Sequence, residues 1–167
     1  DGRDRNVELF VWLGGTVCEM RKKLRQIGLS REHNEYMAMY YAHQMVLGVR
    51  QLLKEMGLGS MLNMPTVMFA DNMAANTLSK EDVVTHGNQY VALAYHFNKE
   101  VQEQSMSTVH YIKTDDNISD LMSKCTEIAV RRRLQGPLSG YDTRLIRRLE
   151  VQVVEICKTW AEEHQVD

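Results

Sequence analysis

The chain has 167 residues, enough for one domain with an appended helix. Its 25% charged residues are ordinary for a globular protein, and its net charge of −2 differs from the basic balance of a dedicated nucleic-acid binder. Three widely spaced cysteines exclude a zinc ribbon and a disulfide framework, and predict an intracellular protein, cytoplasmic or nuclear. The apolar runs are too short for a membrane span, so no membrane partner is expected.

The first third of the chain predicts a β-hairpin followed by a long helix. Residues 9–13 are an apolar run that two glycines close, and residues 16–29 suit a second strand paired across those glycines. Residues 31–56 repeat apolar side chains at helical spacing, and Gly57 stands where that helix should end.

The middle of the chain alternates short strands and helices. Residues 66–70 form a buried-strand pattern that stops at Asp71. The other expected elements are helices at 73–80, 91–104 and 117–124 and a strand at 108–113. Strands interleaved with helices predict an α/β fold, with helices packed on a sheet.

The last part of the chain has a different character. We expect residues 125–140 to form a linker because they hold three consecutive arginines and a Gly-Pro-Leu-Ser-Gly stretch. Residues 141–167 then hold a C-terminal helix. Its apolar positions recur every three or four residues, at Ile146, Leu149, Val153, Ile156 and Trp160. Docking of this helix onto the domain is the simpler interpretation, and a short coiled coil is the alternative.

Two carboxylates could carry chemistry. Asp71 follows a buried strand, which is a common place for functional groups in α/β folds, and Asp120 lies near the start of a short helix. Together they could hold Mg²⁺, which prefers a few carboxylates with water and substrate phosphate. The structural alternative is that Asp71 is a turn residue or a helix cap, and that Asp120 only favours the dipole of its helix.

Several segments resemble, in the same order, motifs of copia-type ribonuclease H domains in retrotransposon Pol polyproteins. The family motifs are LSxxEAEYxA, xxDNxxA, YHFIRE and LADILTK. Here they read LSREHNEYMA at 29–38, FADNMAA at 69–75, YHFNKE at 95–100 and ISDLMSK at 118–124. Residues 4–5 and 13–15 suit the family's DxRxS…FLGG stretch, so the resemblance covers about residues 4–124. Each motif alone is weak, and the ordered set is fairly specific.

The resemblance implies a ribonuclease-H-like domain over residues 1–124, with a mixed sheet and packed helices. The family's opening strand, with its DxDW motif, would precede Asp1. The family's activity is hydrolysis of the RNA strand of an RNA–DNA hybrid by an endonuclease that uses Mg²⁺ or Mn²⁺. A reverse transcriptase domain would lie upstream in the parent polyprotein.

The acidic quartet of the family is incomplete in this chain. Asp71 and Asp120 match its third and fourth members, while the first lies on the opening strand. His33 stands where the family has its metal-binding Glu, and Glu32 is one position away, about 100° round the helix. Gln89 to Ala92 also replaces the family's KHID segment. We therefore expect weak or no nuclease activity from this chain.

Basic residues near the second strand offer a nucleic-acid contact. Alternation along a strand would place Arg21, Lys23 and Arg25 on one face, where they could meet phosphates. Asn72 joins them as a candidate contact beside Asp71. The alternative is a solvated strand edge whose charges deter aggregation.

Three hypotheses follow. The first is a partly degenerate hybrid ribonuclease of a retroelement. The second is a catalytically inactive ribonuclease-H-like module that binds nucleic acid or a protein partner. The third is a structural relic without a selected role.

Overall fold

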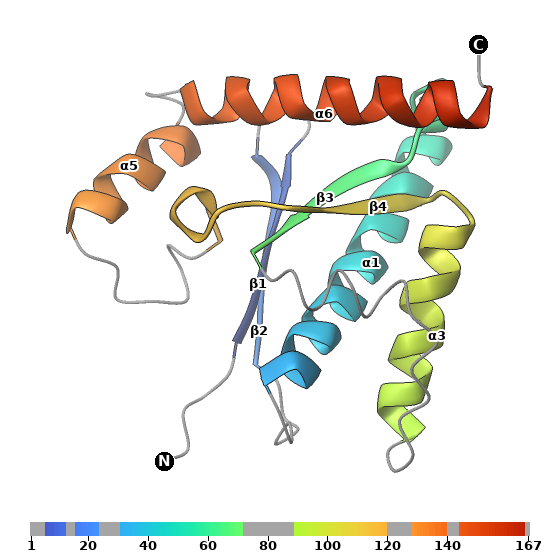
Figure 1. The fold of residues 1–167 in the computed structure, drawn as a ribbon, viewed down its shortest axis with the longest axis horizontal. Helices are drawn as coiled ribbons and strands as arrows, with labels where there is room; N and C mark the ends of the chain where they lie inside the picture. Colours follow the sequence, from blue (N-terminus) through green and yellow to red (C-terminus); the bar gives the residue numbers. More distant parts are fainter. Residues whose placement is uncertain are drawn as a thin grey trace.

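The computed structural model describes residues 6–12, 16–23, 31–71, 89–119, 128–139 and 144–165 (Figure 1). The elements in chain order are β1 (Asn6–Trp12), β2 (Thr16–Lys23), α1 (Arg31–Glu55), η1 (Gly59–Leu62), β3 (Thr66–Ala70), α3 (Gln89–Glu103), β4 (Ser107–Tyr111), η2 (Thr114–Asp116), α5 (Ile128–Ser139) and α6 (Arg144–His164). The expected α/β class is confirmed. No helix in this part of the chain is long and apolar enough to cross a membrane.

Strands β1 and β2 form the expected antiparallel hairpin. The register runs from Asn6 opposite Lys23 to Trp12 opposite Thr16, and it shifts between Val11 and Trp12. The pairing confirms that two strands meet across the glycine pair, although β2 ends at Lys23. The rest of the predicted second strand, residues 24–29, lies outside the described residues.

Strands β3 and β4 pair in parallel, from Thr66 opposite Ser107 to Ala70 opposite Tyr111. Parallel strands need a long crossover, and α3 lies within the connection between these two. One continuous mixed sheet was expected. The described strands instead form two separate two-stranded sheets, because no hydrogen-bonded strand among them joins the hairpin to the β3–β4 pair.

Helices α1 and α3 pack against each other beside the β3–β4 pair (Figure 1). The buried apolar residues of the two helices include Tyr36, Met39 and Val46 of α1 and Ala94 and Val101 of α3. Arg50 of α1 also fixes the entry to β3. Its guanidinium donates to the carbonyls of Leu62 and Met64 and to Thr66 Oγ1, at 2.8 to 3.1 Å.

A glycine ends α1. Gly57 has φ of +79°, and its N–H bonds to the Lys54 carbonyl while the Leu58 N–H bonds to the Leu53 carbonyl. This pair of bonds is a Schellman motif, which needs a left-handed residue at the position of Gly57. The sequence therefore predicted the end of this helix correctly.

We expect Gly57→Ala to lower the free energy of unfolding by about 1 kcal/mol, through backbone strain alone. A Cβ at this position would meet nothing within 4 Å. Gly48→Ala is the matched control, because Gly48 lies inside α1 with equally open surroundings. It should raise the free energy of unfolding by about 0.5 to 1 kcal/mol. Urea denaturation measures both, and changes of the same sign would contradict the interpretation.

The expected linker at 125–140 contains a helix. Helix α5 covers Ile128–Ser139, with Leu134 fully buried. The Gly136-Pro137 pair favours a linker by local propensity, but it lies in the last turn of α5, and the helix ends two residues after Pro137. The predicted helix at 117–124 begins as a turn at Ile118–Ser119, and its remainder, like the predicted helix at 73–80, lies outside the described residues.

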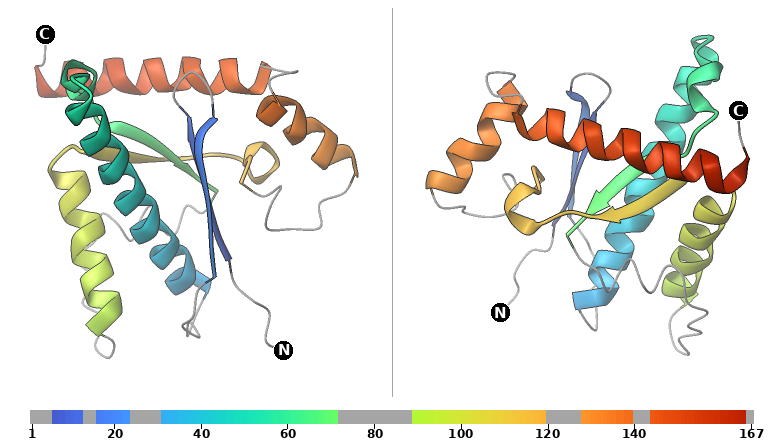
Figure 2. Two further views of the ribbon diagram at one scale, coloured as in Figure 1. Left: turned by 180° about the vertical axis from the view of Figure 1, so that it is seen from behind. Right: turned by 45° about the horizontal axis from the view of Figure 1, so that its top comes forward.

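Helix α6 lies across the β3–β4 pair on the side away from α1 and α3 (Figure 2). Leu145 and Ile146 are buried at its start, and Leu149, Val153, Ile156 and Trp160 are half-buried along it. The apolar seam therefore faces the domain. Within this chain the helix therefore packs on the domain.

Candidate functional site

Asp71 lies directly after β3, partly exposed, where sequence reasoning placed it. The end of the strand is held by a 3.0 Å hydrogen bond from the Ile112 N–H to the Ala70 carbonyl. Because β3 and β4 are parallel and in register, residues that follow either strand meet at the same sheet edge. Asp71 thus occupies the edge where α/β folds commonly place functional groups.

The structure describes only part of the predicted site. Glu32 and His33 lie in the first turn of α1, and Arg21 and Lys23 lie in β2. For these four residues the structure describes the course of the backbone. Asp120, Asn72 and Arg25 lie outside the described residues. The contacts among these candidates therefore stay predictions.

A divalent metal ion would need more ligands than Asp71 supplies. Within the described residues, no three His, Cys, Asp or Glu side chains come close enough to hold a metal ion. Mg²⁺ usually takes one or two protein carboxylates and completes its octahedron with water and phosphate. One partly exposed carboxylate is a poor fit, so a complete site would depend on residues outside the described part.

Asp116 was not among the candidates from the sequence, and the structure gives it a role. Asp116 lies in η2, just after β4, is 8% exposed and pairs with Arg148 of α6 at 2.5 Å. It therefore places a second carboxylate near the sheet edge that carries Asp71. Its ion pair with Arg148 ties α6 to this edge, which gives Asp116 a structural role. An acidic residue shortly after a strand was the available sequence signal.

A buried polar pair joins α1 to α3. His43 and Asn98 are both 0% exposed, and His43 Nδ1 donates to Asn98 Oδ1 at 2.8 Å. The Asn98 amide also donates to the Tyr36 carbonyl at 3.3 Å. Tyr40 contacts the rings of Tyr41 and Phe97, with centroids 5.4 and 5.1 Å away.

Burial perturbs two titratable groups in this region. Desolvation lowers the pKa of His43 below its ordinary 6.5, and the hydrogen bond to Asn98 opposes this shift without cancelling it. Burial, with a smaller effect from Tyr95, raises the pKa of Tyr36 to about 12. His43 Nε2 and the Tyr36 hydroxyl are buried without a hydrogen-bond partner among the described residues. Both groups are therefore expected to be neutral near pH 7.

Folding stability should fall as the pH drops below 6.5, the ordinary pKa of histidine. The unfolded chain binds a proton at His43 more readily than the folded chain, so acid favours unfolding until the pH passes below the lowered folded pKa. Well above pH 6.5 the imidazole is neutral in both states and contributes no pH dependence. Urea denaturation between about pH 8 and pH 5 measures this effect.

His43→Leu should flatten that pH dependence, whatever it does to stability at neutral pH. His96→Gln is the control, because His96 is an exposed histidine on α3. An unchanged slope in His43→Leu would show that other groups produce the pH dependence.

Comparison with known proteins points to transposon polyproteins. The chain is 25% identical over 116 residues, 70% of its length, to the retrovirus-related Pol polyprotein from transposon TNT 1-94 of Nicotiana tabacum. It is 29% identical over 117 residues, 69% of its length, to the corresponding polyprotein from transposon RE2 of Arabidopsis thaliana. The chain spans about 8% of each relative.

The other two comparisons gave no match. No protein-family model matches the chain, and no solved structure does. The relatives support the polyprotein part of the resemblance and leave the individual domain unnamed. The chain is therefore similar, over about 70% of its length, to a short region of two retrovirus-related Pol polyproteins of plant transposons.

Proposed function

We propose that the chain is a degenerate ribonuclease H domain of a copia-type Pol polyprotein, with weak or no hydrolysis of RNA–DNA hybrids. The observation that carries this proposal is the place of Asp71, directly after β3 in a parallel pair of an α/β domain. The sequence around Asp71 resembles the DN motif of the family, and the relatives are Pol polyproteins. The mixed α/β architecture is compatible with such a domain.

Weak activity follows from the charge of the proposed site. In this class of enzyme, divalent metal ions held by carboxylates activate water and stabilise the attacking and leaving oxygens. Asp71 and Asp120 are the carboxylates that this chain would contribute. His33 in place of a Glu removes one negative charge and offers imidazole, which suits Mn²⁺ better than Mg²⁺. The affinity for Mg²⁺ should therefore be low.

The proposal also sets a context for the domain. Its nucleic-acid partner would be an RNA–DNA hybrid, with phosphate contacts from Arg21, Lys23 and Arg25 and from Asn72 near Asp71. A reverse transcriptase domain would precede it in the parent polyprotein. The scattered thiols fit a reducing compartment, cytoplasmic or nuclear.

An inactive binding module is the second candidate function. The replacement of the metal-binding Glu by His33 favours it, since a site short of carboxylates can still present basic residues to phosphates. In this case β2 would supply the phosphate contacts without cleavage. The two functions differ in whether Asp71 matters for any reaction.

Cleavage of a hybrid with a labelled RNA strand tests the proposal on the folded chain. We expect slow or undetectable cleavage in Mg²⁺, more in Mn²⁺, and none from Asp71→Asn in either metal ion. The circular dichroism of both proteins checks that they are folded. Rapid cleavage that Asp71→Asn retains would contradict the proposed site, because the scissile chemistry would then lie elsewhere.

A further inference from the structure

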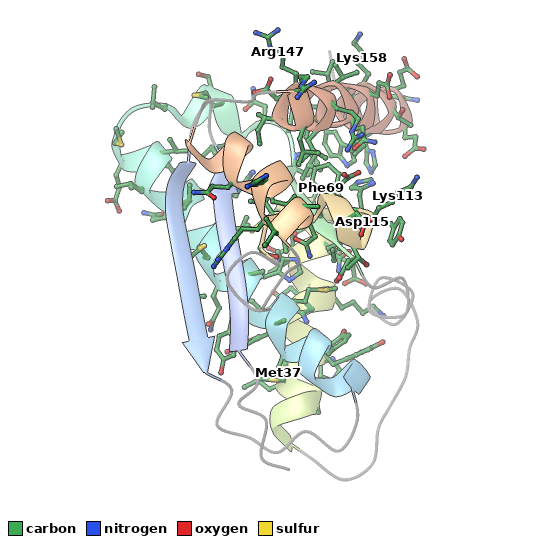
Figure 3. The ribbon with its side chains drawn as sticks, turned by 90° about the vertical axis from the view of Figure 1, so that its left-hand side faces the viewer. Met37, Phe69, Lys113, Asp115, Arg147 and Lys158 are labelled. Carbon is green, nitrogen blue, oxygen red and sulfur yellow. The ribbon has the colours of Figure 1, made fainter. Side chains whose placement is uncertain are left out.

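A cleft follows the outer edge of β4. Its volume is about 920 Å³, and all five residues of β4 line it. The end of α3 forms one wall, and the last three turns of α6 form the other. Phe69 of β3 lies beneath α6 (Figure 3). The cleft is open to solvent, so an extended segment could enter it along the strand.

Backbone groups of β4 point toward its outer edge, away from β3. The Ile112 N–H donates to the Ala70 carbonyl of β3, and the Met106 carbonyl accepts a hydrogen bond from the Thr66 N–H of β3. Because neighbouring residues of a strand point their backbone groups in opposite directions, Val109 and Tyr111 present theirs to the outer edge. No strand in the described part of the chain pairs with that edge. An exposed row of donors and acceptors is a template for an added strand.

The walls of the cleft are acidic. Among the described residues, three carboxylates line it, from Glu103, Glu155 and Glu163, against one ammonium group, that of Lys99. Lys99 lies 3.7 Å from Glu103, so Glu155 and Glu163 of α6 set the remaining charge. The basic residues Arg147 and Lys158 of α6 point away from the sheet (Figure 3). The cleft therefore favours cations and disfavours phosphates.

An aromatic ring adds to this preference. Trp160 lines the cleft and stacks on His164, with ring centroids 4.4 Å apart. An indole face beside carboxylates attracts guanidinium and ammonium groups through its quadrupole. The outer strand edge, the acidic walls and the indole all favour the same kind of ligand, an extended chain with cationic side chains.

We propose that an extended basic peptide, rich in arginine or lysine, binds in this cleft as an added strand on the outer edge of β4. Its backbone pairs with Val109 and Tyr111, and its cationic side chains meet Glu155, Glu163 and Trp160. This mode of recognition takes affinity from main-chain hydrogen bonds and specificity from the flanking side chains. It is independent of hybrid cleavage, because it uses neither Asp71 nor Asp120.

Fluorescence anisotropy with a labelled peptide of about eight residues, alternating arginine with valine, tests the proposal. Saturable binding is expected, with weakening on the order of tenfold or more when glutamate replaces arginine. N-methylation of alternate backbone amides should weaken binding by about the same factor, because it blocks strand pairing. Hydrogen exchange at the amides of Val109 and Tyr111 should slow when the peptide is bound.

A charge-reversed protein supplies the matched comparison. The double variant Glu155→Lys, Glu163→Lys should weaken binding on the order of tenfold or more. Glu162→Lys should leave binding within about twofold, because Glu162 is exposed on the same helix but does not line the cleft.

Three results would overturn the proposal. They are no binding of the basic peptide up to about 1 mM, equal binding by the double variant, or equal binding of the N-methylated peptide. A single-stranded oligonucleotide that displaces the peptide from the cleft would also overturn it, because the site would then select phosphate.

Discussion

Asn98→Ala should lower the free energy of unfolding by about 3 kcal/mol. Asn98 is fully buried, and its amide bonds to both His43 Nδ1 and the Tyr36 carbonyl of the facing helix. Truncation leaves the His43 N–H and this carbonyl buried without their partner and opens a cavity between α1 and α3. Urea denaturation at about pH 7.5, where His43 is neutral, gives the change directly.

Two variants separate this buried pair from general effects of substitution. Gln102→Ala, one turn along α3, removes a partly exposed side chain that bonds only to the Asn98 carbonyl in the described contacts. It should cost less than about 1 kcal/mol. His43→Leu with Asn98→Leu should recover much of the loss, because neither polar partner remains. An Asn98→Ala cost no larger than that of Gln102→Ala would show that the pair does not hold the helices together.

The sequence predicted the elements whose patterns are local. Apolar spacing identified α1, and the glycine with positive φ marked its end. The short run before Asp71 identified β3, and the alternation in residues 108–113 identified β4 to within two residues. These signals depend on neighbours a few positions apart along the chain, which is why they can be read without tertiary contacts.

Contacts between distant residues could not be predicted in the same way. His43 and Asn98 are 55 positions apart, and each alone is an ordinary polar residue in a helix. The ion pair between Asp116 and Arg148 likewise depends on where α6 docks. Helix α5 was missed because Gly136 and Pro137 suggested a linker, although burial of Leu134 favours a packed helix. Tertiary packing outweighed local propensity there.

The same distinction between local patterns and distant contacts applies to the candidate site. The end of a buried strand was enough to place Asp71 correctly. Asp120 was suggested as a partner of Asp71 by its place near the start of a helix, and His33 by the resemblance. Both pairings stay predictions, because these residues are far from Asp71 in sequence. The acidic cleft beside β4 was not predicted, because its carboxylates come from both α3 and α6.

Addition of the family's other acidic groups to this sequence should produce the largest change in activity. The restored chain carries His33→Glu and an opening strand with the DxDW motif fused before Asp1. The outer edge of β3 has no strand paired with it among the described residues, so the added strand has a place to join the two sheets. Cleavage should rise on the order of 100-fold or more, because a bound metal ion supplies several kcal/mol of charge stabilisation.

Each part of the restoration has its own control. His33→Gln with the same fused strand adds a side chain of similar size without the charge, so it should restore little activity. The fused strand with its aspartates changed to asparagine should leave cleavage near that of the starting chain. A gain from these neutral versions equal to that of the full restoration would mean that folding, and not metal binding, limits activity.

The most direct test of the account is therefore the rate of hybrid cleavage in Mg²⁺ by the restored chain, with and without Asp71→Asn. We predict cleavage well above that of the starting chain, and its loss in Asp71→Asn. No gain from a folded restored chain, or a gain that Asp71→Asn leaves intact, would contradict the assignment of this domain to the ribonuclease H region of the polyprotein.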